Sequence, residues 1–167
     1  QDWVYNPVPK FSYGLNIALN YKNFDLSMFW QGVCDQDVYN NQKAQTDFWS
    51  IVDAGSNKGN RLLGAWNTNN TSSTIPALTT NNTADEGRAS SYYVENGSYM
   101  KLRTLQFGYT VPTTFLSKFK MTSARVYVSG QNLLTIKSKS LTCPDPENPN
   151  WNYPLATSVS FGLQIGF

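Results

Sequence analysis

Hydrophobic and polar residues alternate without interruption along one segment near the start of the chain. Between residues 11 and 21 every odd position holds an apolar or aromatic residue, namely Phe11, Tyr13, Leu15, Ile17, Leu19 and Tyr21. The even positions between them hold only Ser, Gly, Asn and Ala. Because successive side chains of a β-strand point to opposite faces, this period of two predicts a strand with one apolar face and one face of small polar residues.

The same alternation returns further along the chain. It predicts five strands in all, at about residues 11–21, 24–33, 98–111, 123–136 and 157–167. In the third of these, the apolar positions change from even (Met100, Leu102) to odd (Leu105, Phe107). Either a β-bulge or a change of environment along the strand would explain this reversal.

The connections between the predicted strands alternate between short and long. Lys22-Asn23 and residues 113–122 are short, whereas residues 34–97 and 137–156 are long. Within the first long connection, residues 40–54 would hold a short helix whose apolar side consists of Ala44, Phe48, Ile51 and Val52. Residues 66–83 are a tract rich in Asn, Thr and Ser that we expect to be a loop.

The composition narrows the classes of function. Of the 167 residues, 14% are charged and 14% are aromatic, the net charge is +2, and there is no His. Without His there is neither a Ser-His-Asp triad nor an imidazole ligand for a metal, and no glycine-rich nucleotide-binding motif is present. Lys and Arg form no cluster, so we expect no nucleic-acid partner. The sequence therefore predicts neither an enzyme nor a cofactor or metal site.

Two architectures would account for five strands that each carry one apolar face. The first is a soluble β-sandwich module, with aromatic loop residues forming a carbohydrate-binding site. The second is part of a transmembrane β-barrel, in which the apolar face meets lipid and the polar face lines the lumen. The barrel is favoured because the polar faces carry Ser, Gly, Asn, Ala, Thr and Gln rather than the Lys and Glu usual in water. Strands of about ten residues, with short turns at one end and long loops at the other, also fit a barrel.

The barrel interpretation assigns positions to particular side chains. The residues expected to face the lumen are Asn16, Asn20, Arg125, Gln131 and Gln164. If the last residue lies in the periplasm, the short turns are periplasmic and the long loops are extracellular. Four aromatic residues then fall near one level, as in the aromatic girdle at a membrane interface: Tyr21, Phe24, Tyr109 and Phe167. Their alternative role is that of ordinary aromatic residues at strand ends.

The last predicted strand also resembles a known signal. The C-terminal β-signal of outer-membrane proteins is similar to residues 160–167, which read SFGLQIGF. The positions that carry the likeness are Ser160, Gly162, Ile165 and Phe167. The resemblance implies that the barrel assembly machinery reads this segment by pairing with it. Because the chain opens with Gln1 rather than Met, we expect a fragment or a mature piece.

Longer segments extend the resemblance to nearly the whole chain. They are residues 6–16, 24–33, 94–103, 105–112 and, most strongly, 125–134, which read RVYVSGQNLL. All are similar to the C-terminal part of the SusC/RagA family of TonB-dependent transporters. The last loop is also similar, with Asp145-Pro146-Glu147 followed by Tyr153-Pro154. It departs from the family in two places: the family often has Gly near the position of Cys143 or Pro144, and Arg near Ala156.

The resemblance implies the fold and function of a larger protein. Family members are outer-membrane barrels of 22 strands with an N-terminal plug, so this chain would supply the last five strands. They import nutrients, either oligosaccharides or peptides, in Gram-negative bacteria. A SusD-like surface lipoprotein caps the barrel, and TonB supplies energy through the N-terminal part. The implied partners are therefore the rest of the barrel and its plug, this lipoprotein, TonB, the barrel assembly machinery and outer-membrane lipid.

The predicted extracellular loops hold aromatic candidates for contact with substrate or lipoprotein. They are Trp49, Trp66, Trp151 and Tyr153. Aromatic rings stack on sugar rings and on peptide side chains, but each of these residues would otherwise pack within its own loop.

Other loop side chains carry weaker signals. Two acidic pairs offer oxygen ligands without the spacing of a calcium loop, so we expect solvated carboxylates at Asp35, Asp37, Asp145 and Glu147. Cys34 and Cys143 both fall on the predicted outer side, where the sequence leaves a disulfide between them open.

Overall fold

The structure is a computed structural model that describes residues 6–48, 58–81, 85–149 and 153–167. The chain divides into two compact units, each treated separately below. The sheet unit comprises residues 9–36, 97–138 and 154–167. The loop unit comprises residues 6–8, 37–96 and 139–153, in so far as they are described.

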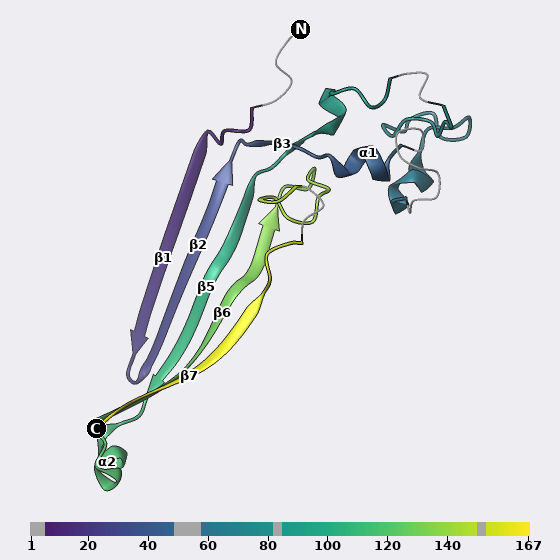
Figure 1. Cartoon of the computed structure of the whole chain (residues 1–167). Coiled ribbons are helices and arrows are strands. Elements are labelled where there is room, and N and C mark those ends of the chain that lie inside the picture. Colours follow the sequence, from purple (N-terminus) through teal and green to yellow (C-terminus); the bar gives the residue numbers. More distant parts are fainter. Residues whose placement is uncertain (1–5, 49–57, 82–84, 150–152) are drawn as a thin grey trace. The chain divides into compact units, whose positions relative to one another are not determined.

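Five antiparallel strands form the sheet unit (Figure 1). They are β1 (Phe11–Tyr21), β2 (Phe24–Cys34), β5 (Tyr99–Thr110), β6 (Ser123–Lys137) and β7 (Ser158–Gly166). Their order in the sheet is β1-β2-β5-β6-β7, so each strand pairs with the next long strand along the chain. The predicted all-β, antiparallel fold is confirmed, and β1 and β7 are the two edges of this sheet.

The pairing register aligns the apolar positions of all five strands. One row across the sheet consists of Leu19, Leu26, Phe107, Val128 and Phe161. Directly opposed residues of antiparallel strands share a face, and neighbours two positions along a strand share it as well. The alternation seen in single segments therefore builds one continuous apolar face, and the small polar residues build the other.

A bulge explains the reversal of the apolar pattern within β5. Leu102 pairs with Trp30 of β2, and Thr104 pairs with the adjacent Phe29, so Arg103 is an extra residue between the two pairs. An extra residue shifts the alternation by one, which returns Leu102 to the apolar face. On the β6 side of this irregularity, Asn132 has a φ of 52°, a left-handed conformation that Asn tolerates well.

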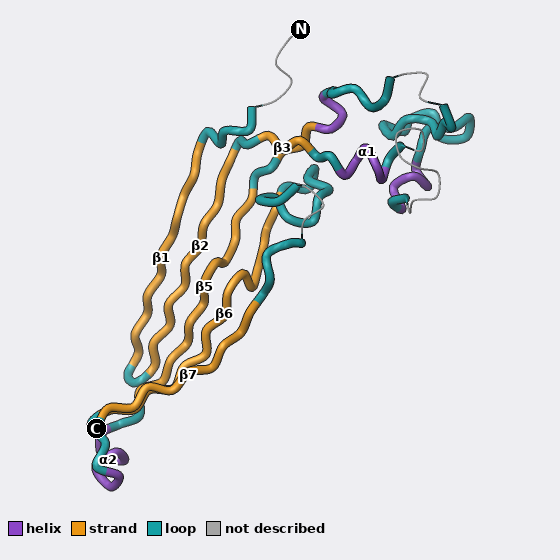
Figure 2. Tube along the Cα trace, in the orientation of Figure 1, coloured by secondary structure: helices purple, strands orange, loops and turns teal. Residues whose placement is uncertain are grey.

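The two short connections of the sheet unit differ in structure (Figure 2). Lys22-Asn23 closes the β1–β2 hairpin, and Lys22 adopts a φ of 54° there. The β5–β6 connection instead contains the helix α2 (Thr113–Leu116) and the 3-10 turn η3 (Ser117–Phe119). None of the helices in the described part of the chain is long and apolar enough to cross a membrane.

The loop unit contains several short elements. They are β3 (Asp37–Tyr39), α1 (Gln42–Thr46), η1 (Asn60–Gly64), η2 (Ser91–Tyr93) and β4 (Val94–Asn96). β3 and β4 pair as an antiparallel ribbon, although they are far apart in sequence. Val38 of β3 packs with Leu141 and Cys143 in a small buried cluster.

The helix expected within residues 40–54 is shorter than predicted. α1 ends at Thr46, where the side chain of Asp47 turns inward to polar partners described below. Phe48 is buried, but against the rings of Tyr92 and Tyr93 rather than as part of a helix. Ile51 and Val52 lie outside the described residues. The described part of 66–83 has no helix and no strand longer than an isolated bridge between Asn67 and Asn70.

Candidate functional site

The apolar face of the sheet is open to its surroundings. The exposed fraction of the residue is 49% for Leu15, 45% for Phe107 and 84% for Phe161. Monomeric soluble proteins rarely expose a continuous apolar surface on this scale, and such surfaces mark contact with a membrane or a partner. The arrangement suits a lipid-facing surface and does not suit the interior of a compact soluble domain.

The opposite face carries small and polar side chains in register. One row consists of Asn20, Asp25, Gly108, Tyr127 and Gly162. The residues predicted to line a lumen all lie on this face: Asn16, Asn20, Arg125, Gln131 and Gln164. Whether that face borders a lumen stays a prediction.

An ion pair crosses three strands of the polar face. Arg125 of β6 donates from Nε to Oδ1 of Asp25 on β2, at 3.0 Å, and from Nη2 to Oδ2 of the same carboxylate. Its Nη1 lies 3.4 Å from Oε1 of Gln164, and its guanidinium carbon lies 5.0 Å from the centre of the Tyr127 ring. Gly108 lies between the strands, and a Cβ there would overlap both charged groups. The bidentate geometry fixes the pair, although both side chains keep about a quarter of their surface exposed.

Sequence reasoning singled out Arg125 but missed Asp25. The two residues are 100 positions apart, and no local spacing links them. Only the sheet order, with β5 between β2 and β6, brings them together.

Gly162 has a structural role that the sequence did not indicate. It pairs with Tyr127, whose ring lies over it so closely that a Cβ at Gly162 would overlap the ring. A residue predicted as part of an assembly signal therefore also leaves room for an aromatic side chain on the polar face. Ser160 lies on the same face, whereas Ile165 lies on the apolar face.

Three of the four predicted girdle aromatics share one row. Tyr21 pairs with Phe24, which pairs with Tyr109, and the rings of Phe24 and Tyr109 are 4.8 Å apart. The same row ends at Leu163 of β7, so Phe167 lies four residues beyond it, directly after the strand. A membrane interface at this level stays a prediction.

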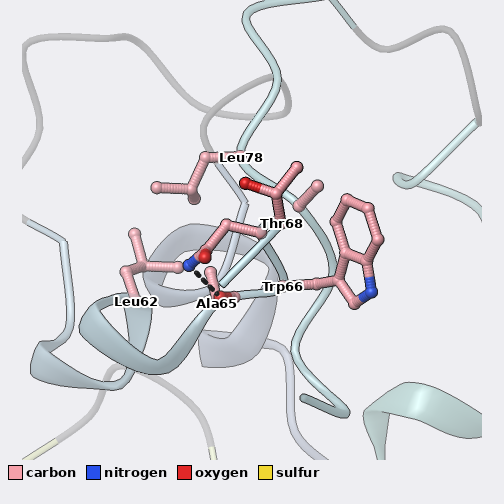
Figure 3. Close-up of a pocket in the computed structure, with 7 residues that line it drawn as sticks. Leu62, Ala65, Trp66, Thr68 and Leu78 are labelled. Atoms are coloured by element: carbon pink, nitrogen blue, oxygen red, sulfur yellow. Dashed lines mark hydrogen bonds between the residues drawn. The ribbon is translucent and has the colours of Figure 1, made fainter. Parts of the chain in front are cut away.

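A shallow cavity of about 400 Å³ lies in the loop unit next to Trp66 (Figure 3). Its lining residues are Leu62, Ala65, Trp66, Asn67, Thr68, Ala77 and Leu78. The backbone N–H of Trp66 donates to the carbonyl of Ile75 at 2.9 Å, and the Asn67 amide donates to the carbonyl of Ala65 at 3.1 Å. The indole of Trp66 stays 44% exposed, so it presents a ring at the rim rather than filling a core.

The other predicted contact residues lie apart from this cavity or cannot be described. Tyr153 is 95% exposed and does not line it. Trp49 and Trp151 lie outside the described residues. Of the four candidates, only Trp66 lines a described cavity.

A buried polar network braces the loop unit. Lys43 Nζ lies 2.9 Å from Oε1 of Glu95, and both side chains are nearly inaccessible. The Glu95 carboxylate also accepts hydrogen bonds from Asn40 Nδ2 (3.1 Å), Thr142 N (2.8 Å) and Thr142 Oγ1 (2.7 Å). Burial alone would raise the pKa of Glu95, but these hydrogen bonds outweigh it and lower the pKa.

A second buried carboxylate, that of Asp47, lies nearby in the same unit. It accepts a hydrogen bond from Tyr92 Oη at 2.6 Å and forms an ion pair with Arg61, whose Nη2 lies 3.3 Å away. Burial and the bond to Asp47 raise the pKa of Tyr92, and burial raises the pKa of Tyr93 to about 12. Both phenols act as hydrogen-bond donors, Tyr92 to Asp47 and Tyr93 to the carbonyl of Glu86.

Three of the four carboxylates expected to be solvated have the following protein partners, and one of the three, Asp145, is buried. Asp35 pairs with Lys10 at 3.0 Å, Asp37 accepts the N–H of Asn6 at 3.0 Å, and Asp145 accepts the N–H of Glu147 at 3.0 Å. The described residues contain no group of three or more potential ligands that could hold a metal ion. Neither cysteine is in a disulfide: Cys34 is exposed, and the buried Cys143 donates from Sγ to the carbonyl of Asp145 at 3.4 Å.

Known receptors resemble this chain over nearly its whole length. TonB-dependent receptor P3 from Formosa agariphila is 34% identical over 164 residues, which are 96% of this chain and 15% of the receptor. TonB-dependent receptor SusC from Bacteroides thetaiotaomicron is 30% identical over 167 residues, or 92% of this chain and 15% of that receptor. No family model matches the chain.

Two solved structures have the same fold as the chain. The structure of the RagAB peptide transporter superposes with a TM-score of 0.75 and 25% identity, covering 92% of this chain and 17% of that one. The RagAB peptide importer in its closed-closed state superposes with a TM-score of 0.80 at 23% identity, covering 98% and 18%. The predicted resemblance to SusC/RagA TonB-dependent receptors is thereby confirmed, and the chain corresponds to a small part of such proteins.

Proposed function

We propose that this chain forms part of the barrel wall of a TonB-dependent transporter that imports a nutrient across the outer membrane of a Gram-negative bacterium. One observation carries the proposal. A single sheet has an exposed apolar face on one side, and on the other mainly small and polar residues that include the Asp25–Arg125 ion pair and the buried Lys101. Such a sheet suits a wall with lipid on one side and solute on the other.

The competing proposal, a soluble β-sandwich that binds carbohydrate, requires a second sheet against the apolar face. The other sheet in the described residues is the ribbon of β3 and β4, with three residues in each strand. A ribbon of that size is too short to cover strands of nine to fifteen residues. Exposed side chains such as Phe161 would then make the chain aggregate in water.

The open edges of the sheet support a larger assembly. Among the described residues, β1 and β7 each pair with one strand, so each presents an open edge of backbone groups. A transmembrane sheet must satisfy those groups, which happens when further strands close the barrel. In this proposal, the rest of the barrel and its plug lie beyond β1 and β7, and the barrel assembly machinery joins them using the pattern of residues 160–167.

The loop unit is the proposed extracellular part. Its buried ion pair and aromatic cluster support a fixed surface rather than an unstructured loop. The proposal assigns this surface, with Trp66 at its cavity, to contact with a substrate or with a SusD-like lipoprotein. The substrate is an oligosaccharide or a peptide, and TonB supplies the energy for its import.

Cell fractionation tests the proposal. In a Gram-negative host, the full-length protein that contains this chain should appear in the outer-membrane fraction. It should be extracted only by detergent and migrate differently in electrophoresis before and after heating, as intact barrels do. Uptake of its nutrient should stop when TonB is deleted. A chain that is monomeric in water and melts cooperatively without detergent would refute the proposal and favour the sandwich.

A further inference from the structure

The connection between β5 and β6 is longer than is needed to join two neighbouring strands. Two residues are enough to join neighbouring antiparallel strands, as Lys22-Asn23 shows between β1 and β2. Between β5 and β6 the chain instead builds α2 and η3. An additional helical turn at the end of a sheet suggests a function beyond chain reversal.

This turn separates apolar from polar side chains. At about 100° per residue, Phe115, Leu116 and Phe119 fall on one side of the turn, and Thr114, Ser117 and Lys118 fall on the other. Leu116 is 4% exposed and anchors the turn, whereas Phe115 and Phe119 are 65% and 70% exposed. Two large rings, four residues apart, are therefore displayed rather than packed.

The turn lies at the end of the sheet that carries the aromatic row. The Thr110 N–H donates to the Asn23 carbonyl at 2.8 Å, so the connection leaves β5 beside the β1–β2 turn. It returns where the Thr122 N–H donates to the Gly166 carbonyl, also at 2.8 Å. The row of Tyr21, Phe24 and Tyr109 lies next to these points, so the displayed rings lie at the same end of the sheet as those aromatic residues.

The charged side chains of the turn itself are all positive. Lys118 and Lys120 lie within it, and Lys22 lies at the neighbouring turn, whereas residues 110–122 contain no Asp or Glu. Lysines beside exposed aromatic rings suit the boundary between lipid tails and phosphate groups, where rings enter the acyl region and ammonium groups meet phosphate.

We propose that the α2–η3 turn is an interfacial anchor, with Phe115 and Phe119 inserted at the headgroup boundary of a phospholipid leaflet and the lysines at its phosphates. The inference rests on the proposed function, because it needs the apolar face to lie in lipid. It adds a lipid-binding element outside the strands. This element lies at the end of the sheet unit opposite to the end at which the chain passes into the loop unit.

Nitroxide spin labels on the full-length protein test the anchor. Cys34→Ser and Cys143→Ala remove the thiols of this chain, any cysteine elsewhere in the protein is replaced as well, and single cysteines are then introduced by Phe115→Cys, Phe119→Cys, Lys118→Cys and Phe161→Cys. Each labelled protein is reconstituted in vesicles of phosphatidylcholine and phosphatidylglycerol. Power saturation compares collisions with oxygen, which concentrates in lipid, and with a water-soluble nickel chelate. All four positions are exposed, so the substitutions remove no packed side chain.

The anchor predicts oxygen-dominated collisions at 115 and 119, as at 161, and nickel-dominated collisions at 118. Nickel-dominated collisions at 115 and 119, with 161 still in lipid, would overturn the anchor and leave the proposed function standing. Oxygen-dominated collisions at 115, 118 and 119 alike would also overturn it, because the turn would then be buried rather than interfacial. If the label at 161 is itself in water, the proposed function fails, and the anchor fails with it.

Discussion

Replacing Leu105 with Arg tests whether the apolar face lies in a bilayer. Leu105 shares its row with Met28 and Ile17, four residues along β5 from Tyr109. Four residues at about 3.4 Å each, on a strand tilted by about 40°, place Leu105 roughly 10 Å deeper than Tyr109. Because the apolar band of such barrels is about 25 Å tall, Leu105 then lies near the middle of the membrane.

Depth determines the expected cost of the substitution. An Arg near the midplane of a barrel's lipid face costs about 2–4 kcal/mol, and one near the interface about 0–1 kcal/mol. We therefore expect a loss of about 3 kcal/mol in unfolding free energy for Leu105→Arg and less than about 1 kcal/mol for Tyr109→Arg. Gln106→Arg, on the polar face, is the matched control and should change the free energy little, because its charge stays hydrated.

Guanidinium titration of the full-length protein in phospholipid vesicles measures these differences as shifts in the unfolding midpoint. The difference in cost between Leu105→Arg and Tyr109→Arg is the informative quantity, because the free-energy cost of burying a charge in a soluble core would not depend on its distance from a strand end. Equal costs at residues 105 and 109, or a cost at residue 106 as large as at residue 105, would refute the lipid-facing orientation.

Three further predictions address the polar face and the loop unit. A double-mutant cycle of Asp25→Ala and Arg125→Ala should give a coupling energy of about 0.5–1 kcal/mol, since the pair is partly solvated; no coupling in guanidinium titrations would contradict the bidentate bond. Gly162→Val should destabilise the protein by about 1–3 kcal/mol through overlap with Tyr127, and the additional change Tyr127→Ala should restore much of that loss. Glu95→Gln should weaken hydrogen-exchange protection of residues 91–96 by about 3–5 kcal/mol, because it breaks a buried ion pair. The folded state lowers the pKa of Glu95, so the stabilisation that its carboxylate provides is complete above pH 4.5 and declines as the pH falls toward the lowered pKa. The unsubstituted protein should therefore lose exchange protection at residues 91–96 over that pH range, after correction for intrinsic exchange. Protection that does not decline would contradict an ionised Glu95 in this ion pair.

The strands were predictable because their information is local. A period of two over about ten residues needs no distant partner, and it gave the range of β1 as the structure has it. The reversal in β5 was visible in the same way, but the sequence left a bulge and a change of environment as equal explanations. Only the pairing with β2 identifies Arg103 as the extra residue.

The side-chain contacts of the site were not predictable, because they join distant segments. Asp25 meets Arg125 across 100 positions, and Lys43 meets Glu95 across two elements of the loop unit. The helix expected at 40–54 was too long for a related reason. Apolar spacing suggested that it continued, whereas Asp47 is held by Tyr92 and Arg61 from elsewhere in the chain.

A spin-label scan along β7 tests most directly whether the two faces of the sheet meet lipid and water. Single labels are placed from 158 to 165, leaving out Gly162, in the full-length protein reconstituted in phospholipid vesicles. Collisions with oxygen should dominate at Val159, Phe161, Leu163 and Ile165, and collisions with a nickel chelate should dominate at Ser158, Ser160 and Gln164. Apolar positions shielded from both reagents, or accessibility without a period of two, would contradict a sheet that separates a bilayer from an aqueous lumen.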